Sequence, residues 1–177
     1  MAAAGLEWAY ANHARMAVLF LALASALLGL GIAAVAAFGT NAALAGTIVL
    51  ILAIFILAFT LLVFVSRVAK HGAVSFSILS RRSIDDAEAA VRSALESDGR
   101  TAHVRVVRSR SRAPARIVSA DGVSARFRIE VTRHAATVEP GTWTEIIEVF
   151  PKGERPEARA LRAKILEGLR SEGSLPR

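Results

Sequence analysis

A long apolar run dominates the first third of the chain. Between Met16 and Ser66 there is no Asp, Glu, Lys, Arg or His over 51 residues. One membrane span needs only about 20 apolar residues to cross a hydrocarbon core of about 30 Å. The run is therefore long enough for two helices, and Gly39-Thr40-Asn41 is its one cluster of turn-forming residues. We expect transmembrane helices near 17–38 and 43–65, joined as an antiparallel hairpin.

Two other interpretations of this run compete with a transmembrane hairpin. A buried hairpin of a soluble protein would carry polar residues on one face of each helix, whereas no face here has a charge. A cleavable signal peptide is suggested by Ala34-Val35-Ala36. The apolar stretch before that site is longer than usual, however, and the only upstream Lys or Arg is Arg15. With or without cleavage, the second helix and all that follows keep the same orientation.

Basic residues flank the outer ends of the hairpin and are missing from its turn. Arg15 precedes the first helix, whereas the turn at 39–42 has no basic residue. The second helix is followed by Arg67, Lys70, Arg81 and Arg82. Because Lys and Arg are enriched in the cytoplasmic loops of membrane proteins, we expect both termini in the cytoplasm and the chain in the cell membrane. The four cations after the second helix are expected to contact lipid head groups.

Small residues recur along both expected helices. On the first helix they are spaced by four (Ser25, Gly29, Ala33 and Ala37), and on the second by seven (Gly46, Ala53 and Thr60). Small side chains let helix backbones approach closely in lipid. We expect them to pack the two helices together, with a homo-oligomer or docking against a larger membrane protein as the alternative. Neither span contains an ionisable residue, which favours an anchor over a transporter.

The segments on either side of the hairpin carry weaker signals. Residues 1–15 are expected to be an N-terminal cytoplasmic segment, the hairpin to span 16–66, and residues 67–82 to be a juxtamembrane linker. Within this linker Phe76 and Ile78 are apolar. The linker either lies at the membrane surface or packs those two side chains on the domain that follows, and the sequence leaves both alternatives open.

Residues 83–172 show the pattern of a small α+β domain, followed by a tail at 173–177. Ser83-x-x-Asp86 is a capping box that predicts a helix to about Ser97. Strands are predicted around 104–106, 126–132 and 143–150, with a fourth as an option, and a helix over 156–170. The expected order is α-β-β-β(-β)-α with an antiparallel sheet and both helices on one face.

Composition excludes several classes of chemistry. The chain has 177 residues, 54% of them hydrophobic, a mean hydropathy of +0.45 and a formal net charge of +7. It has no cysteine, which removes disulfides, thiolate metal sites and cysteine nucleophiles. The four histidines fall outside any HxH or HExxH pattern, so we expect neither a metal site nor a cofactor.

No catalytic constellation appears in the sequence, and we expect a protein that is not an enzyme. There is no GxSxG, P-loop or GxGxxG motif. The carboxylates at 85, 86 and 88 suit the N-terminal end of a helix, where the helix dipole favours anions. Glu145 and Glu148 point to opposite faces of a predicted strand and cannot act as a pair. Glu130 is expected to face an arginine across strands.

Arginines cluster in one segment that has no acidic residue, from Gly99 to Ala120. They are Arg100, Arg105, Arg108, Arg110, Arg112 and Arg116. Guanidinium groups beside a bilayer attract phosphate, so anionic lipid head groups are the first candidate partner. An acidic protein surface, nucleic acid and a merely solvated strand edge are the alternatives.

These features favour a membrane-anchored accessory or scaffold protein. Its cytoplasmic α+β domain would present a basic edge to anionic lipids or to a protein partner. The alternative function is a membrane-tethered nucleic-acid or ribosome-binding protein. Few aromatic residues are available for base stacking, and no RRM or KH signature is present, which makes this the weaker hypothesis.

Overall fold

The chain forms two units in the computed structural model. The hairpin unit is Asn12–Val74, and the sheet unit combines Met1–Ala11 with Ser75–Arg177. The structure describes residues 6–38, 43–97, 99–108, 114–134, 141–151 and 155–171. The expected turn at 39–42, the side chains of Arg110 and Arg112, and the expected tail at 173–177 lie outside the described residues.

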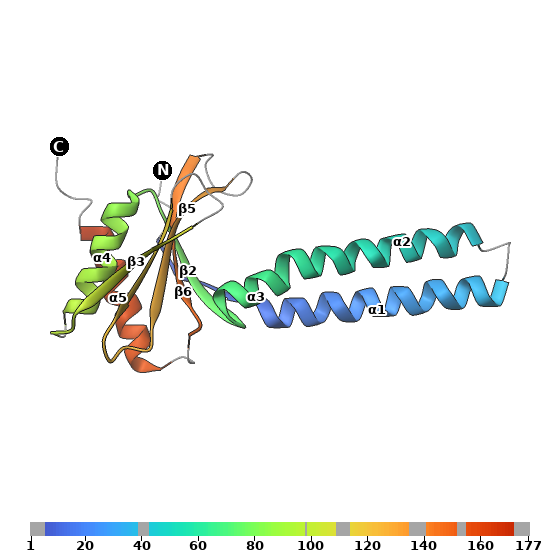
Figure 1. Ribbon diagram of the computed structural model, residues 1–177, viewed down its shortest axis with the longest axis horizontal. Coiled ribbons are helices and arrows are strands. Elements are labelled where there is room, and N and C mark those ends of the chain that lie inside the picture. The colour runs from blue at the N-terminus through green and yellow to red at the C-terminus, as the bar shows by residue number, and fades with distance from the viewer. Residues whose placement is uncertain are drawn as a thin grey trace. The chain divides into compact units, whose positions relative to one another are not determined.

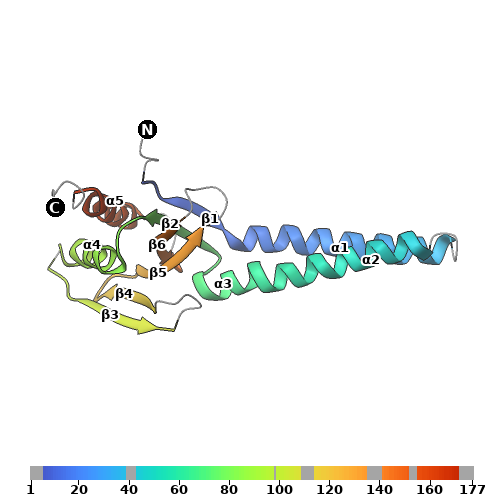
Figure 2. The ribbon, with the colours of Figure 1, turned by 90° about the horizontal axis from the view of Figure 1, so that it is seen from above.

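Two long helices make up most of the hairpin unit, and they run side by side (Figures 1 and 2). α1 spans His13–Phe38 and α2 spans Ala43–Thr60. α2 continues through a π-helical turn, η2 (Leu61–Val65), into α3 (Ser66–His71). Both helical stretches are long and apolar enough to cross a membrane, by length and composition. The two long apolar helices expected from the sequence are thus present.

Polar contacts extend these helices beyond the apolar run. Asn12 Oδ1 accepts a hydrogen bond from the Arg15 N–H (2.9 Å), and this cap lets α1 begin at position 13 rather than at the expected 17. At the other end Gly72 has a φ of 97° and terminates α3. The Ala14 N–H donates to the Ala73 carbonyl (3.0 Å), so a backbone hydrogen bond joins the two ends of the hairpin unit.

A six-stranded sheet in the order β1-β2-β6-β5-β4-β3 forms the frame of the sheet unit. The strands are β1 (Ala9–Asn12), β2 (Val74–Ser80), β3 (Ala102–Val107), β4 (Ala115–Ala120), β5 (Arg126–His134) and β6 (Gly141–Val149). The pairs β2–β6, β6–β5, β5–β4 and β4–β3 are all antiparallel. The expected antiparallel sheet is present, and β4 is the fourth strand that the sequence left optional.

Two strands lie outside the 83–172 domain that the sequence indicates. β2 occupies the expected linker, where Phe76 and Ile78 are buried at 7% and 1% exposure. Of the two alternatives for that segment, packing on the domain is the one observed. β1 precedes the hairpin and has no β-branched residue that would predict a strand from the sequence. Aromatic contacts hold this segment instead, since Trp8 lies 6.3 Å from Phe127 and Tyr10 lies 5.3 Å from Phe76, between ring centroids.

Two helices cover one face of this sheet (Figures 1 and 2). α4 spans Ile84–Glu96, and α5 spans Pro156–Ser171. The predicted capping box is confirmed, because the Asp86 N–H donates to Ser83 Oγ (3.1 Å) while the Ser83 N–H donates to Asp86 Oδ2 (3.3 Å). The core lies between these helices and the sheet. Its fully buried members include Ile78, Val91, Leu95, Val118, Phe127, Ile129, Ile146 and Ile165.

The prediction that Glu130 faces an arginine across strands is wrong. In the register of β5 and β6, Glu130 stands opposite Glu145 rather than an arginine. It forms an ion pair with Arg128, two residues earlier on the same strand, with Nε 2.9 Å from Glu130 Oε2. Residues i and i+2 of a strand share a face, so this ion pair forms along β5 instead of across the sheet.

Candidate functional sites

The seam between α1 and α2 is built from small residues spaced by seven. Ala17, Ala24 and Gly31 are buried on α1, and Gly46, Ala53 and Thr60 are buried on α2. At one level of the seam the backbones come close enough that a Cβ on Gly31 would lie 3.3 Å from the Gly46 carbonyl oxygen. The small residues predicted on α2 therefore lie at the contact between the two helices.

The prediction that the small residues spaced by four on α1 pack against α2 is wrong. Ser25, Gly29, Ala33 and Ala37 are all exposed within the hairpin unit, and a Cβ on Gly29 would meet nothing within 4 Å. At 3.6 residues per turn, a step of four drifts by about 40° around the helix, whereas a step of seven drifts by only about 20°. Only the seven-residue spacing stays on one face over the length of this hairpin.

The four cations after the second helix have different surroundings. Arg67 and Lys70 lie on α3 at the end of the hairpin unit. The Arg81 guanidinium lies 5.0 Å from the centre of the Trp143 ring. Arg82 Nη2 donates to the Leu169 carbonyl (3.4 Å) in the last turn of α5, where a cation also suits the helix dipole. Arg81 and Arg82 thus have protein partners within the sheet unit.

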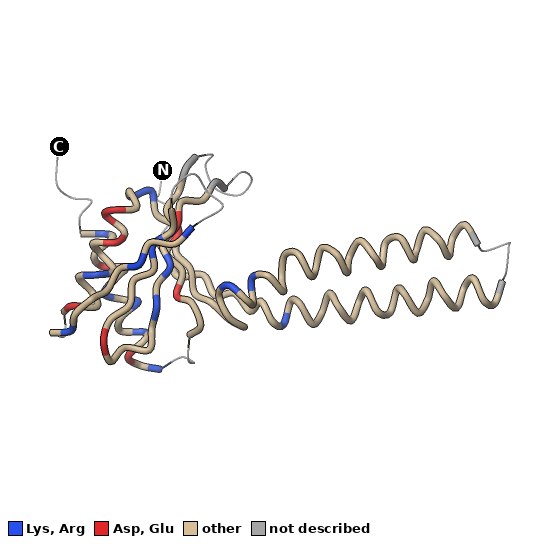
Figure 3. The backbone as a smooth tube through the Cα atoms, in the orientation of Figure 1, with Lys and Arg blue, Asp and Glu red and all other residues tan. Residues whose placement is uncertain are grey.

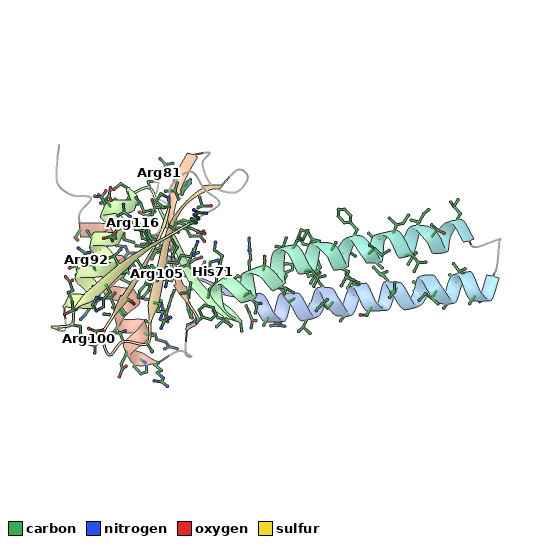
Figure 4. All side chains as sticks on the ribbon, viewed as in Figure 1. His71, Arg81, Arg92, Arg100, Arg105 and Arg116 are labelled. Carbon is green, nitrogen blue, oxygen red and sulfur yellow. The ribbon has the colours of Figure 1, made fainter. Side chains whose placement is uncertain are left out.

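The arginine segment is divided among several environments. β3 is an edge strand, and Arg105 on it and Arg108 just after it are exposed, as is Arg100 before it. Figure 4 shows Arg105 on β3 and Arg116 on the neighbouring strand, β4. The side chains of Arg110 and Arg112 are not described. Three cations of the segment therefore lie exposed at or before the sheet edge, in the part of the chain that the structure describes.

Arg116 does not belong to a free anion-binding surface. Its guanidinium forms ion pairs with Asp85 (2.6 Å) and Glu88 (2.6 Å) at the start of α4. Hydrogen bonds donated to Asp85 and then to Glu88 raise the pKa of Arg116 above its ordinary value. The sequence grouped Arg116 with the other arginines because the two acids lie about 30 residues upstream, and only the fold brings them together.

Two histidines lie together at the end of the hairpin unit. His13 and His71 are each 7% exposed, and their ring centroids are 6.3 Å apart. His103 instead forms an exposed pair with Asp121 (Nε2 to Oδ2, 3.1 Å). Among the described residues no group of three or more His, Asp or Glu side chains is placed to hold a metal ion.

A buried ion pair in the sheet unit was not anticipated from the sequence. Arg162 Nη1 donates to Glu148 Oε2 (2.6 Å), and the two side chains are only 7% and 2% exposed. The guanidinium carbon lies 3.8 Å from the centre of the Phe76 ring, and the Trp8 Nε1–H donates to the Arg162 carbonyl (3.0 Å). The one available signal was Glu148 itself, an acid within an otherwise apolar end of β6.

Next to this ion pair a cleft of about 460 Å³ lies between α5 and the turn from β4 to β5. Apolar groups of Val123, Ala125 and Leu161 line part of it, and Glu148 also contributes to its wall. The charged residues in the lining are Arg100, Glu148, Arg155, Glu157 and Lys164. An apolar wall with a few converging charged groups is the usual form of a small-molecule site.

A second depression, of about 600 Å³, runs along α4. Its charged side chains include Arg116, Glu88 and Arg92. Arg116 is held by its two carboxylates, and Arg92 lies 3.4 Å from Glu88. The charged groups of this groove therefore form ion pairs with one another.

Comparisons of the chain with protein-family models, with curated proteins and with solved structures found no match. The fold therefore defines this protein only by its architecture, which combines two long apolar helices with an antiparallel α+β sheet unit.

Proposed function

We propose that this chain is a two-span integral membrane protein whose hairpin anchors a non-catalytic interaction domain in the cytoplasm. The exposure of large apolar side chains around the hairpin unit carries the proposal. Leu44, Phe55 and Leu62 are 77%, 71% and 74% exposed. Figure 3 shows that charged residues are confined to the base of the hairpin and to the sheet unit. A helix that is apolar on all sides requires lipid or protein around it, and lipid meets this requirement here.

The strand order supports placing both ends of the hairpin on one side of the membrane. β1 precedes the hairpin and β2 follows it, and the two strands are neighbours in the sheet. A chain that leaves and re-enters the same sheet must cross a bilayer an even number of times. Arg15, Arg67 and Lys70 flank the hairpin at this end, which favours the cytoplasmic side.

We assign the interaction role to the basic edge, defined as Arg100, Arg105 and Arg108 at and beside β3. No acidic residue occurs between Gly99 and Ala120 to offset these cations along the chain. The cytoplasmic leaflet carries anionic lipids and is always within reach of a tethered domain. We therefore favour lipid head groups over an acidic protein, and in this role the protein would be an accessory or scaffold subunit. Nucleic-acid binding stays the alternative.

The test uses the full chain, because a fragment beginning at Ser83 would lack both β1 and β2. The protein is reconstituted in nanodiscs of zwitterionic lipid, and flotation with added phosphatidylserine vesicles is measured. Arg105→Gln/Arg108→Gln should lose most of the binding, and high salt should abolish binding by the unmodified protein. Arg126→Gln/Arg159→Gln removes the same charge from two other exposed positions and should retain it.

Two results would overturn this role. Equal flotation of both double variants would show that net charge, and not the basic edge, drives binding. Nuclease-sensitive co-purification at low salt, lost with Arg105→Gln/Arg108→Gln, would establish the nucleic-acid alternative instead.

A further inference from the structure

Few large apolar side chains are exposed on the sheet unit. Among the described residues of this unit they are Tyr10 (57%), Val106 (63%) and Phe150 (53%). Val106 lies on the edge strand β3, whereas Tyr10 lies on β1 and Phe150 directly follows β6. A single exposed apolar residue is common on any protein, but two aromatic residues exposed at one place indicate a contact surface.

The strand pairing places Tyr10 and Phe150 at the same end of the sheet. β1 and β2 are neighbours, and the ring of Tyr10 lies 5.3 Å from the ring of Phe76 near the start of β2. On the other side of β2, Phe76 stands opposite Glu148 of β6. Because β2 and β6 are antiparallel, Phe150 lies at the end of the sheet where β2 begins. The two exposed aromatic residues therefore lie on the two strands that flank the start of β2.

The chain enters and leaves the hairpin at this end of the sheet. α1 begins at His13, three residues after Tyr10. β2 follows α3 after only Gly72 and Ala73. Three residues of extended chain span at most about 11 Å. With the hairpin in a bilayer, these short connections hold the end of the sheet that carries the two aromatic residues near the lipid surface.

An unusual backbone conformation accompanies the exposure of Phe150. Its φ is 52°, the one positive value among the described residues other than glycine. Bulky side chains are disfavoured there, and such outliers cluster at functional sites. Ile146 and Glu148 are buried on one face of β6, and regular alternation would place position 150 on that face as well. The chain instead leaves the phenyl ring half exposed, which is unfavourable in water unless the ring has a partner.

We propose, on the basis of the membrane function above, that Tyr10 and Phe150 form an aromatic anchor in the interface of the bilayer that the hairpin crosses. Aromatic residues are enriched at membrane–water interfaces, where an apolar ring meets lipid and a tyrosine hydroxyl stays hydrated. Lipid is a better partner than another protein here, because the hairpin holds lipid permanently beside this end of the sheet. The anchor would restrict rotation of the sheet unit about its two connections to the hairpin.

The test measures lipid contact at single introduced cysteines, since the chain has none of its own. Tyr10→Cys, Phe150→Cys and Val106→Cys each receive the same small apolar fluorophore, in nanodiscs of zwitterionic lipid. Lipids with a quencher near the head group should quench the labels at 10 and 150. The label at 106 is the matched control and should stay unquenched. Zwitterionic lipid removes the anionic head groups that would attract the basic edge.

Phe150→Gly separates lipid contact from folding. Glycine adopts a φ of 52° without strain, so the thermal stability should be unchanged or raised. Loss of the ring should increase the mobility of the sheet unit, measured as a lower fluorescence anisotropy of a label on the exposed Glu167→Cys. Tyr10→Ser/Phe150→Gly should increase the mobility further, and Val106→Ser should leave it unchanged.

Three results would overturn the anchor. Labels at 10 and 150 that are quenched no more than the label at 106 would show no specific lipid contact. Protection of both labels from lipid-borne and water-soluble quenchers alike would show a protein contact, such as a second copy of this chain. A marked loss of thermal stability in Phe150→Gly would show that the ring belongs to the fold.

Failure of the anchor is separable from failure of the membrane hairpin. Phe55 on α2 is 71% exposed, and a label on Phe55→Cys should be quenched by lipids that carry the quencher deep in the acyl chain. Quenching at 55 without quenching at 10 and 150 would overturn the anchor alone. Absence of quenching at 55 would overturn the hairpin and the anchor together.

Discussion

Glu148 and Arg162 are charged residues that lie inside the sheet unit. Both side chains have lost nearly all contact with water, and their mutual hydrogen bond is 2.6 Å long. Desolvation of two ions is costly, and such a pair is weak evidence for stability by itself. Removal of one partner is different, because it leaves the other charge buried without compensation. The contribution of the pair to stability is therefore best measured by replacing one of its two residues.

Glu148→Gln should destabilise the sheet unit by about 3–5 kcal/mol. The substitution keeps the size of the side chain but leaves the Arg162 guanidinium without a counter-charge against Phe76. Chemical denaturation of the full chain in detergent, followed by tryptophan fluorescence, measures the loss. Asp121→Asn is the matched control: its partner His103 is 58% exposed, and the change in stability should stay within about 0.5 kcal/mol.

Glu148→Gln/Arg162→Met should recover part of the lost stability, because the uncompensated charge is then gone. A double variant that is less stable than Glu148→Gln alone would contradict this account. It would show that the contacts of Arg162 with Phe76 matter more than the buried charge.

The residue scale is where the sequence predicted least. Arg162 carries no signal in the sequence that it would be buried, and the sequence groups Arg116 with the exposed arginines. Each is paired with an acid that lies at least 14 residues away in the chain. Local periodicity carries no information on such partners, because they depend on how strands and helices pack. Ser83 and Asp86 were predicted correctly, since both groups of a capping box lie within one turn.

At the scale of elements, the hairpin depends on small residues at the α1–α2 seam. A Cβ added to Gly46 would lie 2.5 Å from Val35 Cγ2 and 3.3 Å from the Gly31 carbonyl oxygen, so the Val35 side chain or the helix backbones must shift to admit it. A Cβ added to Gly29 would meet nothing within 4 Å. These two glycines therefore allow a matched comparison within one hairpin.

Gly46→Ala should lower the thermal stability of the hairpin, whereas Gly29→Ala should leave it unchanged or raise it, since alanine favours a helix more than glycine does. Circular dichroism during heating in detergent follows the helical signal. Equal effects of the two substitutions would contradict the observed seam. A loss with Gly29→Ala alone would instead show that the exposed stripe makes contacts in an oligomer.

The N-terminal segment is a second element whose role depends on distant contacts. Trp8 packs against Phe127 and donates to the Arg162 carbonyl, while Arg170 Nη2 donates to the Leu6 carbonyl (3.2 Å). Trp8→Ala should cost about 2–4 kcal/mol, because it removes part-buried aromatic surface and leaves a cavity at the core. Hydrogen exchange should then accelerate in α5. Exposed Glu7→Ala is the control, and equal exchange in both variants would contradict this role.

The elements that the sequence predicted and those that it missed differ in physical origin. The long helices follow from an uncharged run, and α4 and α5 follow from caps and apolar stripes, all of which are local signals. β1 has four residues and no strand pattern, so it exists only because β2 and the aromatic contacts of Trp8 and Tyr10 hold it. The α1 seam was missed because abundant alanine makes several small-residue spacings available at once.

For the whole molecule, β1 and β2 constrain the way in which the chain can cross a bilayer. The hairpin is inserted between two neighbouring strands of one sheet, so both flanks of the hairpin must lie on the side where that sheet folds. The absence of cysteine from the sequence makes this directly measurable, since any introduced cysteine is unique. Glu7 and Glu167 are exposed positions on the two flanks, and Asn41 lies in the expected turn.

In intact cells, a membrane-impermeant maleimide should label Asn41→Cys and leave Glu7→Cys and Glu167→Cys unlabelled until the membrane is permeabilised. Permeabilised cells give the maximum labelling of each variant and so control for local accessibility. Labelling of both flanking positions from outside would reverse the orientation but keep the two spans. Labelling of only one flank would contradict the hairpin, because β1 and β2 could not then pair in the same sheet. Labelling of one flank alone would therefore contradict both the two-span topology and the pairing of β1 with β2 in the six-stranded sheet.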